Sequence, residues 1–401
     1  MQAKILTILA ALALLTGCMD QGHPYPQEKL NALTVVAVYP DGYAVQAGAD
    51  VSVTEVSGAG EYAGRADGFG SITFHLPNGI YRVNIRDKDG EMVFNATEDK
   101  VKVVNGPVTL NMELKVSKAG AIVIKEIYNG GCSKAPLEGT YQSDKYVILH
   151  NNSIDTYYLD GLCMGTLSPY NSHGSGNPWI KDGKLPDFLP IIQAVLMMPG
   201  SGKDFPLEPG EDAIIALNGA IDHSAQYPNS VDLNRPDVFA LYDQTLFPNT
   251  VYHPSPGPLV SRDRYLIIVI KTGQANAYTL SVTSPAFVLF RTPEDVNIFD
   301  YVLDNANLPQ VPGSNEKVVA IPIDWVADGV EVFNGSSSGN FKRLPETVDA
   351  GAVSLSSNFK GYSLMRNVNQ KASESFGFEM LEDSNNSTLD FYETDKQSLH
   401  P

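Results

Sequence analysis

Basic charge, cysteine and long apolar runs are all scarce in this sequence of 401 residues. Lys and Arg number 28 against 46 Asp and Glu, which gives a formal net charge of −18. Such an acidic chain is repelled by nucleic acids and by anionic lipid surfaces, so we expect no binding to DNA or RNA. Beyond residue 15 no run is apolar enough to cross a membrane, because the densest one, residues 189–198, contains Pro190 and is followed by Pro199 and Gly200.

The first residues indicate export. One charged side chain, Lys4, precedes a short apolar run over residues 5–15, which is typical of a signal peptide. The motif Leu-Thr-Gly-Cys that ends at Cys18 resembles the lipobox of bacterial lipoproteins. The resemblance implies a signal peptide over residues 1–17, acylation of Cys18 and a lipidated tether over residues 18–30, and hence an anchor in the bacterial cell envelope, in the outer membrane. An ordinary secretory signal with an incidental cysteine is the alternative.

Only two cysteines remain once Cys18 is assigned to lipid. Cys132 and Cys163 form an even pair in a compartment that permits disulfides. We therefore predict a disulfide between Cys132 and Cys163. The alternative is two buried free thiols that never meet.

Apolar and polar residues alternate in the part of the chain that follows the tether. Leu33, Val35 and Ala37 define one apolar face, and similar runs follow after turn residues such as Asp67-Gly68. A period of two broken by such turns predicts short antiparallel strands. Helical periodicity is weak throughout, so the expected fold class is all-β.

Three segments of this first part carry a family resemblance. Residues 49–53, 66–70 and 74–83 together resemble the transthyretin-like or carboxypeptidase-regulatory-like β-sandwich of exported bacterial proteins. The resemblance implies a β-sandwich over residues 31–117 that acts as a spacer or docking module and has no catalytic residue.

A different pattern begins at residue 118. Residues 122–128, 145–153 and 158–162, and later residues 207–211 and 361–366, resemble the lamin-tail-like domain, an immunoglobulin-type β-sandwich. The expected second domain therefore spans residues 118–401.

The whole chain is similar to Bacteroidetes lipoproteins of unknown function that combine these two parts. That resemblance implies no active site, but it makes a TonB-dependent uptake system a plausible partner. Residues 168–204, the first insert, and residues 288–329, the second insert, exceed what a minimal lamin-tail sandwich requires. Long loops on a β scaffold are commonly functional.

Candidate metal ligands are scattered along the chain. His173 and His223 are the candidates for zinc, since no HExxH motif and no pair of CxxC motifs is present. Carboxylates gather in the second insert, and Asp300 and Asp304 are its candidates for calcium. The other carboxylates of this group are Asp295, Asp324 and Asp328. Solvated loop residues of an acidic protein without a cofactor are the alternative.

Two aromatic residues of the first insert are candidate binding residues. Tyr170 and Trp179 lie among polar residues, and exposed aromatic rings in such surroundings suit sugars or protein partners. Packing inside a sandwich core is the alternative.

The sequence therefore favours a membrane-anchored, non-catalytic binding or scaffolding protein of the envelope, with an outer-membrane transporter or a glycan as partner. The first alternative is an exported metal-assisted hydrolase with a site formed by residues 168–204 and 288–329. The match of residues 335–339 to G-x-S-x-G does not favour a serine hydrolase, because Pro345 follows where a helix is needed. A purely structural surface protein is the second alternative.

Overall fold

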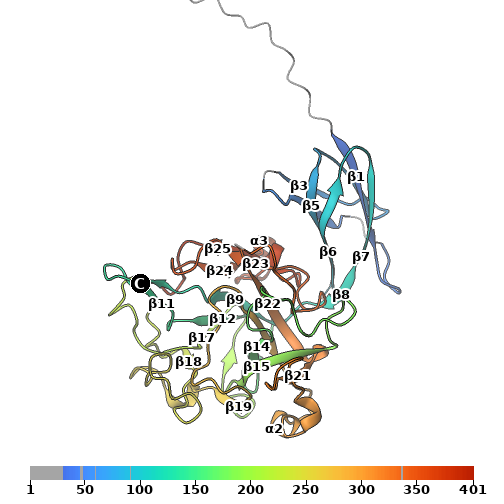
Figure 1. Cartoon of the computed structure of the whole chain (residues 1–401). Helices are drawn as coiled ribbons and strands as arrows, with labels where there is room; N and C mark the ends of the chain where they lie inside the picture. Colours follow the sequence, from blue (N-terminus) through green and yellow to red (C-terminus); the bar gives the residue numbers. More distant parts are fainter. Residues whose placement is uncertain (1–29, 46–47, 59, 91, 336) are drawn as a thin grey trace, which may run out of the picture.

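Strands account for most of the regular structure in the computed structural model, which describes residues 30–45, 48–58, 60–90, 92–335 and 337–401 (Figure 1). The predicted signal peptide, Cys18 and residues 18–29 of the predicted tether lie outside the described residues. Several sheets and only short helices make up the described part, which confirms the all-β fold class. Among the described residues, no helix has the length and apolar character needed to cross a membrane.

The first unit, residues 30–118, is a sandwich of two sheets. Its smaller sheet has the order β4-β1-β7 and consists of β1 (Asn31–Val38), β4 (Ser71–Leu76) and β7 (Val108–Glu113). Its larger sheet has the order β3-β2-β5-β6-β8 and consists of β2 (Asp50–Glu55), β3 (Glu61–Arg65), β5 (Gly79–Asp89), β6 (Met92–Val103) and β8 (Lys115–Lys118).

Alternation positions the core of the first unit. Every second residue of β1 is buried, beginning with Asn31 and then Leu33, Val35 and Ala37, as the sequence predicted for the apolar three. These side chains pack against Val51, Val53 and other inward-facing residues of the larger sheet. Because successive residues of a strand point to opposite faces, the residues between them, Ala32, Thr34 and Val36, face outward.

The second unit, residues 122–401, is a larger sandwich of a six-stranded and a seven-stranded sheet. The six-stranded sheet consists, in order, of β18 (Val238–Ala240), β17 (Asp212–Ala216), β12 (Tyr146–Asn151), β9 (Ile122–Tyr128), β24 (Ser363–Arg366) and β25 (Phe391–Thr394). The seven-stranded sheet consists, in order, of β19 (Ile267–Lys271), β15 (Phe188–Met197), β14 (Cys163–Leu167), β20 (Ala286–Phe290), β22 (Val326–Asn334) and β23 (Val353–Leu355), with β21 (Val319–Pro322) paired to β15.

Smaller elements join these strands. Two short ladders are formed by β10 (Cys132–Ser133) with β11 (Thr140–Tyr141) and by β13 (Tyr157–Tyr158) with β16 (Pro206–Leu207). The helices of the described residues are η1 (Arg262–Arg264), α2 (Ile298–Tyr301), η2 (Asn305–Asn307), η3 (Ile323–Trp325), α3 (Gln370–Phe376) and α4 (Ser387–Asp390).

Both sheets of the second unit are covered on their outer faces as well. Every residue of β12, β14 and β20 is buried, so these strands are mostly apolar and do not alternate between a buried and an exposed face. The outer face of the seven-stranded sheet packs against Ile298 and Val302 from the second predicted insert. The two predicted inserts meet there, because β15 and β21 pair with Leu189 opposite Ile321.

The predicted disulfide is wrong, since Cys132 and Cys163 are both free and buried. The Cys132 thiol donates to Asp144 Oδ2 over 3.5 Å, beside the six-stranded sheet. Cys163 belongs to the apolar cluster on the outer face of the seven-stranded sheet. The whole sandwich separates the two thiols, and facing sheets alone lie about 10 Å apart, which is too far for a disulfide.

Candidate functional site

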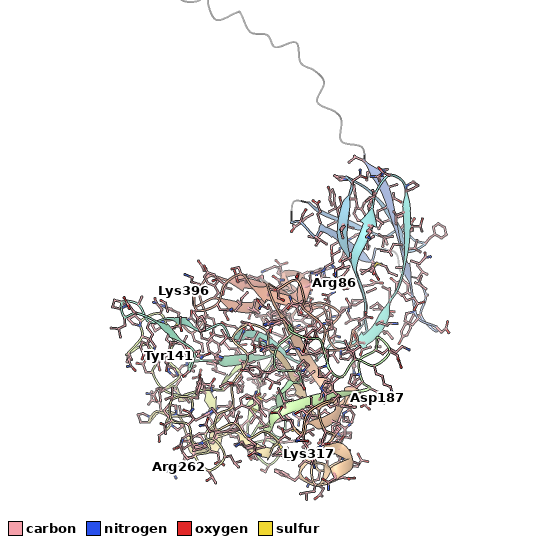
Figure 2. All side chains as sticks on the ribbon, viewed as in Figure 1. Arg86, Tyr141, Asp187, Arg262, Lys317 and Lys396 are labelled. Carbon is pink, nitrogen blue, oxygen red and sulfur yellow. The ribbon has the colours of Figure 1, made fainter. Side chains whose placement is uncertain are left out.

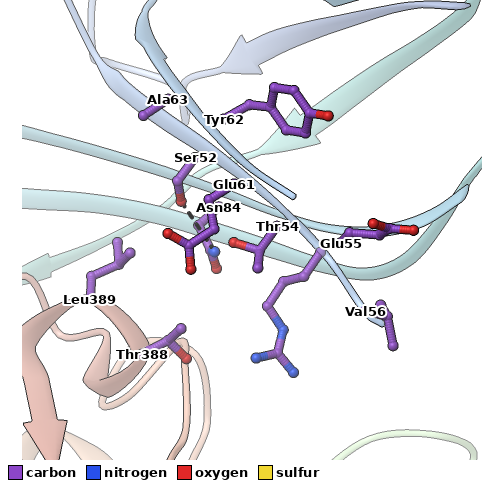
Figure 3. Close-up of a pocket in the computed structure, with 11 residues that line it drawn as sticks. Ser52, Thr54, Glu55, Val56, Glu61, Tyr62, Ala63, Asn84, Thr388 and Leu389 are labelled. Carbon is purple, nitrogen blue, oxygen red and sulfur yellow. Dashed lines mark hydrogen bonds between the residues drawn. The ribbon is translucent and has the colours of Figure 1, made fainter. Parts of the chain in front are cut away.

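A cleft lies between the two units (Figure 3). It has a volume of about 680 Å³, and its floor is the outward face of β2, β3 and β5 in the first unit. Thr388 and Leu389 of the second unit form the opposite wall. Both lie more than 300 residues after the floor residues in the sequence. This volume lies within the range of about 300–1,000 Å³ that is common for ligand sites.

The cleft continues along the strands through two further cavities. A cavity of about 430 Å³ shares Ser52, Ala63 and Leu389 with the first. A third, of about 450 Å³, shares Arg65 and Arg86 with the second and reaches the end of β5. The three cavities therefore form one groove along the outward face of the larger sheet.

Strand register sets the order of the side chains on the groove floor. Ser52 of β2 pairs with Asn84 of β5 and with Ala63 of β3, and Thr54 pairs with Arg82. The residues between them, such as Val53 and Val83, point into the core. The sequence folds this way because polar and apolar residues alternate in both strands.

The arginine side chains of the floor are already paired with carboxylates. Arg65 Nε lies 3.1 Å from Asp50 Oδ1, and Arg86 lies 3.6 Å from the other oxygen of the same carboxylate. Arg82 Nε donates to Asp99 Oδ1 over 2.5 Å. The arginines of the floor therefore face carboxylates, and the carboxylates of Glu55 and Glu61 also line the first cavity.

Residues 382–390 of the second unit, a loop that ends in α4 and is called the wall loop below, form the wall of the groove and join the two units. Figure 2 shows Arg86 at this junction. The contacts across it include Arg86 to Glu382 (3.4 Å), the Asn95 amide to the Ser384 carbonyl, the Asn385 amide to Ser117 (2.7 Å) and the Gly120 N–H to Asp383 (2.7 Å).

A buried arginine holds this wall loop in place. The Arg366 guanidinium, 1% exposed, lies 2.6 Å from Asp328 and 3.2 Å from Asp383. It also lies 3.7 Å from Asp390 and stacks over the Phe391 ring. The wall loop is thus anchored to the core of the second unit by charge-assisted hydrogen bonds.

Three carboxylates share this one buried guanidinium, and the pKa values of Asp390 and Asp328 are raised. Burial raises the pKa of Asp390 to about 7, although Arg366 opposes the shift. Burial raises the pKa of Asp328 to about 6 in the same way. Because the negative charges outnumber the positive one, the site favours keeping a proton near neutral pH.

The candidate zinc ligands do not converge. His173 Nδ1 lies 3.3 Å from Ser284 Oγ, whereas His223 hydrogen-bonds to the Tyr141 hydroxyl and to the Gly219 carbonyl. Burial lowers the pKa of His223, which favours its neutral form. Both rings therefore have local partners that explain their positions.

The candidate calcium ligands also serve local structure. Asp304 caps η2 by accepting from the Ala306 N–H over 2.9 Å, and Asp300 is exposed on α2. Asp328 is buried against Arg366 instead of lying in a loop. Within the described residues, no group of three or more His, Cys, Asp or Glu side chains could hold a metal ion.

The candidate binding aromatics lie away from the groove. The Tyr170 hydroxyl hydrogen-bonds to Thr279 Oγ1 over 2.9 Å, and the Trp179 ring packs edge-on against Phe188 at 5.5 Å between centroids. Sequence reasoning missed the groove floor, whose only signal was the alternation of Asp50, Ser52 and Thr54 with valines. That signal marks an outward face but does not identify the segment that covers it.

Comparisons with known proteins place this chain beside a family of unknown function. Residues 208–398 match the family model described as a protein of unknown function (DUF4876). The crystal structure of a DUF4876 family protein from Bacteroides thetaiotaomicron VPI-5482 is 25% identical, with a TM-score of 0.60, over 90% of this chain and 94% of that chain. The likeness therefore extends over both units, and the expected similarity to a Bacteroidetes family of unknown function is confirmed.

Two other solved structures share much less. A DUF3823 family protein from Parabacteroides merdae ATCC 43184 is 14% identical, with a TM-score of 0.18, over 39% of this chain and 76% of that chain. A putative adhesin from Bacteroides ovatus ATCC 8483 is 10% identical, with a TM-score of 0.21, over 86% of this chain and 98% of that chain. Neither likeness is close enough to bear on this fold. No curated protein matches the sequence.

Proposed function

We propose that this protein is a non-catalytic binding or scaffolding protein of a bacterial envelope, held to the outer membrane by two or three acyl chains on Cys18. The observation that carries the proposal is the groove between the two units, which is lined by side chains from both of them. Preorganised polar groups on a rigid sheet suit recognition, because little side-chain entropy is lost when a ligand binds.

In this proposal the first unit is a transthyretin-like spacer and the second is a lamin-tail-like module. The contacts of Arg86 and of the wall loop fix the two units relative to one another, so a bound partner meets one surface. An outer-membrane transporter of the TonB-dependent class is the proposed protein partner. The lipobox motif that ends at Cys18 supports the anchor.

The anchor is tested by growing cells that express the chain with an alkyne-labelled fatty acid. We expect the wild-type chain to incorporate the label and to fractionate with membranes, and the Cys18→Ala variant to do neither. An unlabelled wild-type chain that remains inside the cell would refute the anchor.

The binding role is tested by cross-linking intact cells and identifying what co-purifies. Ala63→Trp places an indole on the exposed groove floor, and His75→Trp places the same ring on an exposed site of β4, in the other sheet. We expect an envelope partner with the wild type and with His75→Trp, but less of it with Ala63→Trp. A partner set that is the same for all three proteins would show that the groove is not the binding surface.

A further inference from the structure

We infer that the first unit rests on the lipid bilayer with one defined end, the tether end, which consists of Leu30, Ile80, Val104 and the residues next to them. This inference rests on the proposed acyl anchor at Cys18 and adds a second contact, which the folded protein itself makes. Three observations carry it: the exposed apolar side chains of this end, its lack of carboxylates, and its place beside the anchored part of the chain.

Strand pairing brings the segments of the tether end together. Asn31 of β1 pairs with Leu76 at the end of β4, and the start of β5 pairs with the end of β6. The side-chain oxygen of Asn78 accepts from the Asn31 amide over 2.9 Å and from the Asn105 N–H over 3.0 Å. The turn after β4 and the loop after β6 are therefore fixed beside the first residue of β1.

Three apolar side chains of the tether end face solvent. Leu30 is 53% exposed, Ile80 is 42% exposed and Val104 is 52% exposed. Ile80 lies opposite Lys102 in the ladder of β5 and β6, so an apolar and a basic side chain stand side by side on the outward face. This combination suits a bilayer interface, because apolar side chains can enter the acyl region while lysines reach the headgroups.

Charge distinguishes the tether end from the rest of the molecule. Lys100 and Lys102 are both exposed there. The chain has 46 Asp and Glu residues, yet none of them occurs in the three segments that meet at this end, residues 30–40, 71–81 and 100–112. Because anionic headgroups repel an acidic surface, the end without carboxylates is the one that can approach them.

The first carboxylates further along these strands are set back from the tether end. Glu55, the last residue of β2, lies opposite Tyr81 and lines the groove. Asp99 of β6 lies 2.5 Å from Arg82. Neither one stands between Val104 and the surface that Val104 faces, since both precede it on the way out of the sheet.

The position of the tether end matches the anchor. Figure 1 shows the start of β1 on the side of the first unit that faces away from the second unit. Residues 18–29 join Cys18 to Leu30, and a chain of this length spans at most about 40 Å. Acyl chains on Cys18 would hold this end at a high effective concentration next to the bilayer, so a weak apolar contact is sufficient.

The test measures which end of the first unit meets lipid. Val104→Cys and Ile80→Cys each place a thiol at the tether end, and Phe69→Cys places one before β4, at the opposite end, where the native side chain is 85% exposed. The native Cys132 and Cys163 are buried, so the new thiol takes up a nitrobenzoxadiazole fluorophore. The lipidated full chains are reconstituted into phosphatidylcholine vesicles that contain a lipid with a spin label on its acyl chain.

We expect the spin-labelled lipid to quench the fluorophore in the Val104→Cys and Ile80→Cys chains at least about twofold more than in the Phe69→Cys chain. Equal quenching at the two ends would overturn the inference. A blue shift of the Val104→Cys fluorophore without quenching by the lipid would show that a protein segment covers this end, which would overturn it as well. Circular dichroism confirms that each variant folds.

A charge reversal tests the part played by the lysines. In vesicles that also contain phosphatidylglycerol, Lys102→Glu should lower the quenching of the Val104→Cys fluorophore by about twofold or more. Its matched control is Lys115→Glu, an exposed lysine of β8 outside the tether end, which should leave the quenching unchanged. Equal quenching in both variants would overturn the charge argument.

The fatty-acid labelling described above separates this inference from the proposed function. If the wild type is acylated but its tether end is quenched no more than the opposite end, the anchor stands and only the bilayer contact is wrong. If the wild type is not acylated, the anchor and the bilayer contact are both wrong.

Discussion

Asp390→Asn should remove a pH dependence from the stability of the second unit. Asp390 is 1% exposed, and its carboxylate accepts hydrogen bonds from the Ser384 N–H and hydroxyl and from the Asn386 N–H. An asparagine of the same shape keeps these contacts, because its oxygen accepts from the two N–H groups and the Ser384 hydroxyl can turn to accept from its amide. It therefore imitates the protonated acid at every pH.

The expected size follows from the shift in pKa. The pKa of Asp390 is about 7 in the folded protein and 3.8 as the reference for the unfolded chain. Because the folded pKa is the higher one, the folded state holds the proton more tightly. The stabilisation is complete below about pH 4 and is lost as the pH rises through about 7. At about 1.4 kcal/mol per pKa unit, the wild type should lose about 3 kcal/mol relative to Asp390→Asn between pH 5 and pH 8.

Urea unfolding at pH 5, 6, 7 and 8 measures this difference. The two tryptophans, Trp179 and Trp325, both lie in the second unit, so their fluorescence reports the unfolding of that unit. Comparing variant with wild type at each pH cancels the opposing titration of His223 and His253, whose pKa values are lowered by burial. A difference that stays constant from pH 5 to pH 8, or that changes in the wild type's favour, would refute the reasoning.

Three further predictions concern buried groups. In a Cys18→Ser chain, Cys132 and Cys163 should resist a thiol reagent until the chain unfolds, because burial raises the pKa of each thiol to about 12. If the chain is unfolded without reductant and shows no reactive thiol, it contains a disulfide and the prediction is wrong. Arg343→Met should destabilise the protein by about 3–5 kcal/mol in chemical denaturation, because it leaves the buried Glu331 carboxylate unpaired. Its control, Arg235→Ala at a half-exposed ion pair, should cost about 1 kcal/mol or less, and equal losses would contradict the distinction. Burial lowers the pKa of Lys145 from 10.5 to about 7. The wild type should therefore gain stability relative to Lys145→Met as the pH rises from 7 to 10. A stability difference that does not change with pH would show that Lys145 is not desolvated.

Local pattern predicted the first unit better than the second. In β1 and β2 the alternation of apolar and polar residues places Leu33, Val35 and Val51 in the core, as the structure confirms. The strands of the second unit gave no such pattern, because segments far away in sequence cover both faces of β12 and β14. Asp328 shows the same limit, since it is predicted as a loop carboxylate and lies buried against Arg366.

The sequence by itself determined the all-β class, the inward face of each alternating strand and the acidic surface, because these depend on residue type and on spacing within one strand. Only the tertiary structure decided that Cys132 and Cys163 lie apart, that Arg366 gathers three carboxylates, and that Thr388 and Leu389 close a groove over β2. Each of these depends on contacts between residues widely separated in sequence. Spacing along one chain carries no information on such contacts, because they are set by which faces of the sheets pack together.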